Sequence, residues 1–423
     1  MKKFIAFLCV AVLVLSSVAV LAACAHEPTE VELTIAEAEK MTLAQLEAAA
    51  QEEFEAAKAA DPSIKFVAKA TTSGVSKVLT KFQEKYSWFE YDTSFKSDKD
   101  TDAFKALDET VAKGNFWADF TMIQIASSIN SYVNRYLLLN YVPQNDNEIE
   151  LSADATQPLV GLYADKLFVY NKSAVGDWEL KNIWQLTGAD GATLKKAAAV
   201  SFQDPTNEGI NMAFLTSLTS PESVEKLTAA YKSYFGTDYK KTDSCKNIGY
   251  HFVEQFVQHC GSHGSDSKVL SEAIAKDTIG TVYVVGLNKV KGYVDAAGNT
   301  VKQGAKWYDD LWYAGVHGDV EGYNGYTYNT YLSVPSTSRL PYTACLFARY
   351  ILTEEGFRAG WSDVGYSSPN AKVTPNVDTS ANNAPGGSYS YELNPAKVLQ
   401  EVIAWTSKNT ANVRKFVAAN WNA

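Results

Sequence analysis

Apolar and polar residues alternate in blocks along the middle of the chain, and the blocks switch between the period of a strand and the period of a helix. Residues 64–70, IKFVAKA, form a short apolar run that predicts a buried strand. The next stretch places Val75, Val78 and Phe82 on one face of a predicted helix. Further strands are predicted at residues 88–95, 118–125, 166–172, 197–205, 281–287 and 330–335, and further helices at 100–114 and 209–218. Strands and helices that alternate at this spacing indicate parallel βαβ units, so the sequence predicts an α/β fold.

Helical patterns flank this central region. Residues 41–62 are rich in Ala, Glu and Leu, with a candidate N-cap at Thr42 and a stop at Asp61-Pro62. Residues 336–423 are predicted to be mainly helical, interrupted by a loop rich in Gly, Pro and Asn. We expect the first of these regions to be a surface helix that leads into the main fold.

The first 24 residues have the layout of an export signal. Lys2 and Lys3 precede an almost wholly apolar run, 4–20, and small residues follow it up to Cys24. The segment 21–24, LAAC, resembles the lipobox of bacterial lipoproteins, which implies that 1–23 is removed and that Cys24 is acylated. We therefore expect a protein that is lipid-anchored at the extracytoplasmic face of the cell membrane. A transmembrane anchor or an ordinary cleaved signal is the alternative, because the apolar run is near spanning length.

Composition narrows the class of protein. The 423 residues are 46% hydrophobic and 20% charged, which fits a globular protein of two or three domains. The formal net charge of −10 argues against nucleic acid as a partner, because phosphates require a basic surface.

Sequence signatures of catalysis are absent. The chain contains no GxGxxG, Walker A, HExxH or GxSxG motif, so we expect no cofactor and no enzymatic activity. His259, Cys260 and His263 have a spacing that could share a metal ion, but the Gly-Ser loop that follows favours the end of a helix, and we expect no metal there. An exported hydrolase remains an alternative because carboxylates are abundant.

Three cysteines follow Cys24. Cys245 and Cys260 are 15 residues apart and could close a disulfide loop in an exported protein. Cys345 lies in an apolar helical stretch and is interpreted as a buried thiol. The disulfide is one of two alternatives, the other being free thiols.

Several stretches resemble a known family when they are taken in order. The first strand, ligand loop and helix of that family resemble residues 65–86, KFVAKATTSGVSKVLTKFQEKY. Its next strand element resembles residues 111–124, VAKGNFWADFTMIQ, in which Ala118-Asp119 matches the family's Ala-Asp pair. The family's crossover into a second lobe resembles residues 166–175, KLFVYNKSAV. Its second ligand loop resembles residues 200–218, VSFQDPTNEGINMAFLTSL, and its closing helix resembles residues 336–361, STSRLPYTACLFARYILTEEGFRAGW. From residue 64 to residue 370 the chain thus resembles the solute-binding proteins of ABC importers with the type 2 periplasmic-binding-protein fold. The most similar branch includes binders of ferric ion and sugar phosphates.

The resemblance implies two lobes with a hinge between them. The expected boundaries are a signal at 1–23, a tether and surface helix at 24–62, lobe 1 at 63–165 plus 275–335, and lobe 2 at 166–274 plus 336–423. It also implies a monomer that captures a small polar solute between the lobes and delivers it to an ABC permease. A surface adhesin or a sensor lipoprotein is the remaining alternative.

Candidate ligand-binding residues follow from the position of loops after strands. In open α/β sheets, ligands bind beyond the carboxyl ends of the strands, where helix N-termini present free N–H groups. The loops that follow three predicted strands supply Thr71, Thr72, Ser73, Gln124, Asp204, Thr206 and Asn207. Tyr283 and Tyr323 are candidates for stacking on the solute. Plain helix capping is the competing interpretation for each Ser, Thr and Asp.

Two departures from the family bear on the ligand. Glu208 stands beside the second predicted helix start, where a carboxylate would repel a phosphate but accept hydroxyls or pair with a cation. The chain has no Tyr-Tyr pair of the kind that the resemblance would imply for ferric ion. We therefore expect a sugar or a related polar solute, with sugar phosphate weakened and ferric ion less favoured.

Overall fold

The computed structural model describes residues 26–188, 200–263, 282–288, 292–294, 300–302, 311–363, 365–378, 389–390 and 395–421. A mixed sheet runs through the molecule, with strands in the order β1-β2-β11-β4-β7-β5-β6. These strands are β1 (Ala68–Ala70), β2 (Phe120–Gln124), β4 (Val160–Asn171), β5 (Val200–Gln203), β6 (Cys260–His263), β7 (Val282–Gly286) and β11 (Gly325–Pro335). Short strands β3 (Leu138–Leu139), β10 (Leu311–Tyr313), β12 (Tyr366–Ser367) and β15 (Leu399–Gln400) pair alongside β4 or β11. Two small hairpins are separate: β8 (Gly292–Val294) with β9 (Thr300–Lys302), and β13 (Val377–Asp378) with β14 (Tyr389–Ser390).

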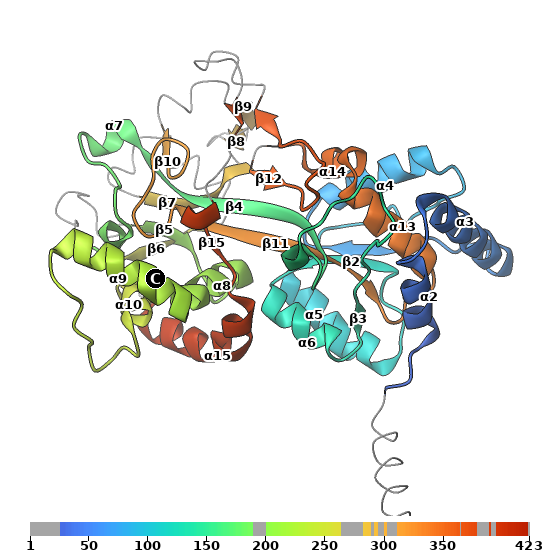
Figure 1. The fold of residues 1–423 in the computed structure, drawn as a ribbon, viewed down its shortest axis with the longest axis horizontal. Coiled ribbons are helices and arrows are strands. Elements are labelled where there is room, and N and C mark those ends of the chain that lie inside the picture. Colours follow the sequence, from blue (N-terminus) through green and yellow to red (C-terminus); the bar gives the residue numbers. More distant parts are fainter. Residues whose placement is uncertain are drawn as a thin grey trace, which may run out of the picture.

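The long antiparallel strands β4 and β11 join two lobes, as Figure 1 shows where they cross the middle of the molecule. The register runs from Gly325 opposite Leu167 to Tyr331 opposite Val160, with an irregularity between Thr330 and Tyr331. At one end β11 pairs with β2, and at the other β4 pairs with β7. Two strands that pass between lobes in this way form a hinge.

The first lobe is built on β1, β2 and β3. Its helices are α2 (Glu30–Ala38), α3 (Leu43–Ala60), α4 (Gly74–Lys85), α5 (Asp100–Glu109), α6 (Ala126–Val133), α13 (Pro341–Leu352) and α14 (Glu354–Trp361). An aromatic cluster forms its core: the Phe347 ring makes edge contacts with Phe66 at 5.5 Å and Phe82 at 5.2 Å, and all three side chains are buried. Burial of each such ring contributes about 2–3 kcal/mol to stability.

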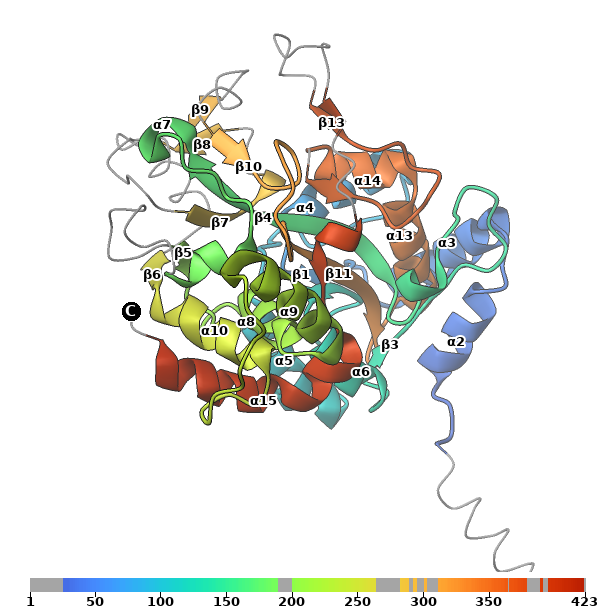
Figure 2. The same ribbon diagram turned by 60° about the vertical axis from the view of Figure 1, so that its left-hand side comes forward.

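The second lobe is built on β5, β6, β7 and β10. Its helices are α7 (Lys172–Val175), α8 (Gly209–Leu218), α9 (Pro221–Phe235), α10 (Ile248–Gln258) and α15 (Ile403–Asn420). Short 3-10 turns complete the two lobes at Val111–Lys113, Ala153–Ala155, Ile183–Thr187 and Pro395–Lys397. The last helix, α15, runs along α8 and α10 (Figure 2), and Trp184, Phe202 and Phe252 lie in the core beneath.

The α/β class and the predicted elements are largely confirmed. Helix α3 begins at the expected cap, where Thr42 and Gln45 exchange hydrogen bonds in a capping box, and it ends before Asp61-Pro62. The predicted strand at 88–95 is wrong, because this segment contributes only a single bridge from Tyr91 to Phe66.

The expected lobe boundaries need correction at two places. Helices α13 and α14 had been grouped with lobe 2, but they pack in the same core as α3 and α4 of the first lobe. Strands β7 and β10 had been grouped with lobe 1, but they pair with the second-lobe end of β4. Apolar periodicity identifies a helix or strand but does not say which of two cores it covers.

Among the described helices, none combines the length and the apolar character needed to cross a bilayer. The apolar run at 4–20 and the lipobox cysteine, Cys24, lie outside the described residues.

Candidate functional site

A cleft of about 670 Å³ opens between the two lobes. The first lobe contributes Thr71, Asp98, Lys99, Asp100, Thr101, Phe104, Gln124, Ile125 and Ser128, and the second contributes Gln203, Asp204, Thr206, Asn207, Glu208, Gly209 and Arg414. Most of the lining side chains are polar. The volume is within the range of pockets that hold small molecules.

The first-lobe wall is formed where β1 and β2 end. The backbone of Thr71 donates to the Met122 carbonyl at 3.0 Å, which holds the two strand ends together. The Gln124 N–H donates to the Asp100 carboxylate at 2.8 Å, so α5 begins directly against the end of β2. This arrangement brings Thr71, Gln124 and Asp100 to one rim of the cleft.

Ile125 follows β2 in an unusual backbone conformation. Its φ is 67° and its ψ is 78°, in the left-handed region that a β-branched residue seldom occupies. The conformation turns the chain into α6 and directs the side chain toward the second lobe, where Ile125 contacts Gly209. Strain of this kind persists only where surrounding structure enforces it, and it is frequent at binding sites.

The second-lobe wall is the loop between β5 and α8. The Asp204 carboxylate accepts hydrogen bonds from the Thr206 N–H at 2.8 Å, the Thr206 hydroxyl at 2.7 Å and the Asn207 side-chain amide at 2.7 Å. Arg414 donates to the Thr206 carbonyl at 2.7 Å, so α15 supports the same loop. The loop is therefore ordered by its own polar side chains before any solute contacts it.

Glu208 occupies the N-cap position of α8 without capping it. Its side chain makes no hydrogen bond to the helix N-terminus, and its carboxylate accepts instead from the Gln203 amide at 3.4 Å. The helix N-terminus is thus left facing the cleft, and an anionic side chain lies beside it.

Carboxylates outnumber cations in the cleft lining. Four acidic side chains (Asp98, Asp100, Asp204, Glu208) face two basic ones (Lys99, Arg414). The pKa of Asp100 is raised to about 7, chiefly because burial disfavours the charged carboxylate; the hydrogen bond from the Gln124 N–H opposes this rise, and the negative charge of Glu208 across the cleft adds to it. Negative potential from both lobes therefore meets in this space.

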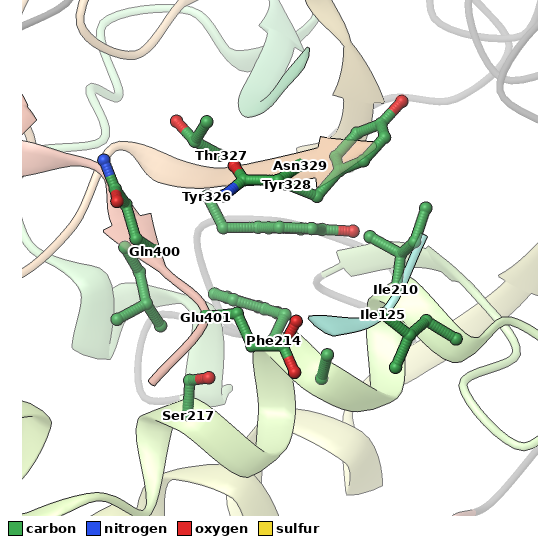
Figure 3. A pocket seen from close by; sticks show the side chains of 12 residues that line it. Ile125, Ile210, Phe214, Ser217, Tyr326, Thr327, Tyr328, Asn329, Gln400 and Glu401 are labelled. Atoms are coloured by element: carbon green, nitrogen blue, oxygen red, sulfur yellow. The ribbon is translucent and has the colours of Figure 1, made fainter. Parts of the chain in front are cut away.

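A second pocket lies where the hinge strand β11 packs on α8, within the core of the second lobe. In Figure 3 the Tyr326 ring lies over the Phe214 ring, with a centroid distance of 4.4 Å and an interplanar angle of 15°. Beside them the Glu401 carboxylate accepts from the N–H groups of Ala126 and Ser127 at 3.1 and 3.3 Å. The segment before α15 is thereby attached to the N-terminus of α6 in the other lobe.

Five of the nine candidate ligand residues line the cleft: Thr71, Gln124, Asp204, Thr206 and Asn207. The other four are placed elsewhere. The Thr72 hydroxyl accepts from the Trp361 indole N–H at 3.0 Å, and Ser73 is the N-cap of α4. The Tyr323 hydroxyl donates to the Ser223 hydroxyl at 3.1 Å within the second lobe, and Tyr283 is a buried strand residue of β7.

Of the two alternatives for Cys245 and Cys260, the structure contains free thiols and no disulfide, and the buried thiol predicted at Cys345 is confirmed. The 11-residue helix α10 separates the first pair; such a helix is about 16 Å long, whereas disulfides require Cα atoms within about 7 Å. Cys260 is buried at the start of β6, and His259, the C-cap residue of α10, donates from its Nδ1–H to the Gln255 carbonyl at 2.7 Å.

Sequence reasoning missed several residues of the cleft lining. Asp98, Asp100 and Ser128 come from helix starts that carried no distinctive motif, and Arg414 comes from a helix far away in the sequence. An acidic residue in the first turn of a helix that follows a loop is a weak signal that could have identified Asp100.

No family model matches the chain, and no curated protein matches it by sequence. Solved structures do match in fold. The Trichodesmium protein IdiA (FutA), solved with iron and citrate, has a TM-score of 0.55 at 13% identity and covers 85% of this chain and 100% of its own. The apo ferric ion-binding protein A of Pasteurella haemolytica has a TM-score of 0.57 at 12% identity, covering 84% of this chain and 97% of its own.

A third structure carries an organic ligand. It is the periplasmic binding protein MotA of A. tumefaciens B6 in complex with glucopine, with a TM-score of 0.55 at 12% identity, covering 84% of this chain and 99% of its own. The likeness extends over most of this chain, which has two lobes, two long strands between them and an interlobe cleft. The fold of this chain is therefore that of the two-lobed, type 2 periplasmic substrate-binding proteins of ABC transporters.

Proposed function

We propose that this protein is a lipid-anchored, extracytoplasmic receptor that captures a small cationic or hydroxyl-rich solute between its lobes and delivers it to an ABC importer. The observation that carries the proposal is the cleft of about 670 Å³ lined from both lobes by polar side chains, with four carboxylates and two cations. Solved proteins of the same fold, at 9–13% identity, include a substrate-binding protein of an ABC transporter and receptors that hold iron or glucopine.

The mechanism follows from the hinge. Closure of the lobes about β4 and β11 would bring Thr71 and Gln124 on one wall toward Asp204 and Asn207 on the other. A solute that contacts both walls stabilises the closed state by its differential affinity for the two states. A permease that recognises only the closed arrangement then accepts loaded receptor.

Charge in the cleft selects the solute class. Glu208 lies at the N-terminus of α8, the position where an anionic solute would gain most from the free N–H groups. Its negative charge beside those groups repels phosphate. An ammonium group or a set of hydroxyls gains from the same carboxylate, which favours amines and sugars over sugar phosphates. Ferric ion is less favoured, because none of the lining residues is a tyrosine.

The anchor belongs to the proposal as well. Export and acylation at Cys24 would place the receptor next to its permease, and two or more acyl chains hold a protein stably at about 0.8 kcal/mol per buried CH₂. Replacement of Cys24 by Ser should release the protein from the membrane fraction into the medium, while a protein that stays with membranes would indicate a different attachment.

A thermal-shift screen tests the binding function. The panel holds free sugars, sugar phosphates, polyamines, thiamine and ferric citrate, and a true ligand at 100 times its Kd adds about 2.7 kcal/mol to stability. We expect a hit among the amines or free sugars. A panel without any hit, repeated on protein stripped of bound solute by partial unfolding, would favour the adhesin or hydrolase alternative.

One matched pair of variants tests the cleft. Glu208→Gln removes the charge without removing a helix cap, and Glu222→Gln makes the same change in the first turn of α9, outside the cleft lining. For a cationic ligand we expect Glu208→Gln to weaken binding about tenfold or more, which is about 1.4 kcal/mol. Equal affinities of the two variants would refute the assigned site.

A further inference from the structure

Three metal-ligating side chains meet on the second lobe, away from the cleft. Cys245 lies just before α10, and His251 and Glu254 lie on that helix. One ligand atom from each residue lies within 4.8 Å of the other two. The Cys245 thiol donates to Glu254 Oε2 at 3.4 Å, and His251 Nδ1 is 3.8 Å from the same oxygen. None of the three lines the interlobe cleft.

The local fold explains why these side chains converge. Residues three apart lie on one helix face, so His251 and Glu254 point the same way. The Asn247 side chain accepts from the Tyr250 N–H and caps α10, which turns the preceding segment back so that Cys245 lies over the first turns. The opposite face of α10, with Phe252 and Phe256, is buried in the lobe core.

The donor set and its dimensions fit a tetrahedral transition metal. A thiolate, an imidazole and a carboxylate are the ligand types of zinc sites. In a tetrahedral shell with Zn–S near 2.3 Å and Zn–N or Zn–O near 2.0–2.2 Å, neighbouring donor atoms are about 3.4–3.6 Å apart. The two distances to Glu254 Oε2, 3.4 and 3.8 Å, are close to this geometry. The Cys245 and His251 donor atoms lie within 4.8 Å of each other, so side-chain rotation must bring them closer when the ion binds.

The cluster is partly exposed to solvent, and one of its nitrogen atoms, which could bind a metal ion, has no hydrogen-bond partner. The His251 and Glu254 side chains are 20% and 15% exposed, so a water molecule can complete a fourth position. His251 Nδ1 is buried without a hydrogen-bond partner, because its distance to Glu254 exceeds hydrogen-bond length. A thiol–carboxylate hydrogen bond alone would leave this nitrogen unused.

We propose that Cys245, His251 and Glu254 form a binding site for a divalent transition metal ion of the zinc class, with water as a fourth ligand. Cys245 binds as the thiolate after its proton passes to solvent. The bound ion attaches the segment between α9 and α10 to the surface of α10. It is distinct from any solute in the cleft, so its presence does not depend on the proposed transport function.

Cobalt(II) titration of the purified, metal-free protein provides the test. Tetrahedral cobalt with a thiolate ligand gives a sulfur-to-metal charge-transfer band in the near ultraviolet and visible d–d bands. We expect both to saturate at one equivalent and to disappear on addition of zinc. The cleft lining contains no cysteine, so the charge-transfer band distinguishes this site from metal held by the cleft carboxylates.

Three variants complete the experiment. Cys245→Ser should abolish the charge-transfer band, and the isosteric Glu254→Gln should weaken cobalt affinity at least tenfold. Cys345→Ala, in the other lobe, should leave both unchanged. Cobalt binding without a charge-transfer band in the unaltered protein, or a band that persists in Cys245→Ser, overturns the proposal. The charge-transfer band of the unaltered protein is measured without any variant. The proposal can therefore be tested even if a variant fails to fold.

Discussion

The Cδ1 atom of Ile125 lies 2.3 Å from the position that a Cβ would take on Gly209. Ile125 lies between β2 and α6 in the first lobe, and Gly209 is the first residue of α8 in the second lobe. A Cβ at this position would clash with the Ile125 side chain unless that side chain moved. The pair is therefore a point of close approach between the two lobes within the cleft lining.

A larger residue at Gly209 should hold the lobes apart. We expect Gly209→Val to reduce solute affinity at least tenfold, about 1.4 kcal/mol, with a smaller effect on the Tm of the solute-free protein. Calorimetric titration with the solute found in the screen measures this. Adding Ile125→Ala should restore most of the affinity, because it removes the clashing atoms; a double variant no better than Gly209→Val would show that lobe contact is not the cause.

Asp100 should make stability depend on pH. Its folded pKa of about 7 exceeds the unfolded value of about 3.9. The folded state therefore binds the proton more tightly, and this contribution to stability is greatest below pH 4 and is lost as the pH rises to 7. Asp100→Asn keeps the acceptor for Gln124 without the charge, so we expect it to be more stable at pH 8 by about 1–3 kcal/mol.

Urea unfolding between pH 4 and pH 8 measures the Asp100 effect. Asp98→Asn, which alters a neighbouring cleft carboxylate, is the control and should retain the pH dependence of the unaltered protein. Parallel stability curves for Asp100→Asn and the unaltered protein would contradict the assignment.

Asp119 should be essential for stability of the first lobe. It is fully buried and accepts from the Arg339 N–H at 2.9 Å, the Arg339 guanidinium at 3.0 Å and the Val67 N–H at 2.9 Å. Asp119→Ala leaves these donors without the carboxylate, which should cost about 3–5 kcal/mol in the free energy of unfolding. Glu109→Ala, the control, breaks an exposed pair with Lys105 and should cost less than about 1 kcal/mol.

Thr71 and Thr72 should separate binding from stability. Thr72→Val removes the acceptor for the Trp361 indole at 3.0 Å, so we expect a loss of about 1–3 kcal/mol in stability and little change in solute affinity. Thr71 lines the cleft, and its hydroxyl makes only a 3.5 Å contact to the Met122 carbonyl, so Thr71→Val should weaken binding and leave stability nearly unchanged. The opposite pattern would restore Thr72 as a ligand residue.

Local sequence determined the elements and much of the cleft. Apolar runs predicted β2, β4, β5 and β7, and the position of polar loops after strands identified Thr71, Gln124, Asp204 and Asn207, because strand ends of one sheet meet at a common edge. The chain order of these motifs resembles that of the solute-binding proteins of ABC importers, and this resemblance implied two lobes.

Tertiary structure decided what depends on distance in space. Two relations join segments far apart in the chain: α13 and α14 pack in the core of the first lobe, and Asp100 faces Glu208. The separation of Cys245 from Cys260 is local but depends on the formation of α10 between them. The period of apolar residues indicates only that a residue is buried. It does not indicate which other side chains that residue packs against. Gly209 shows the same limit, since its need for glycine comes from Ile125 in the other lobe rather than from its own backbone conformation.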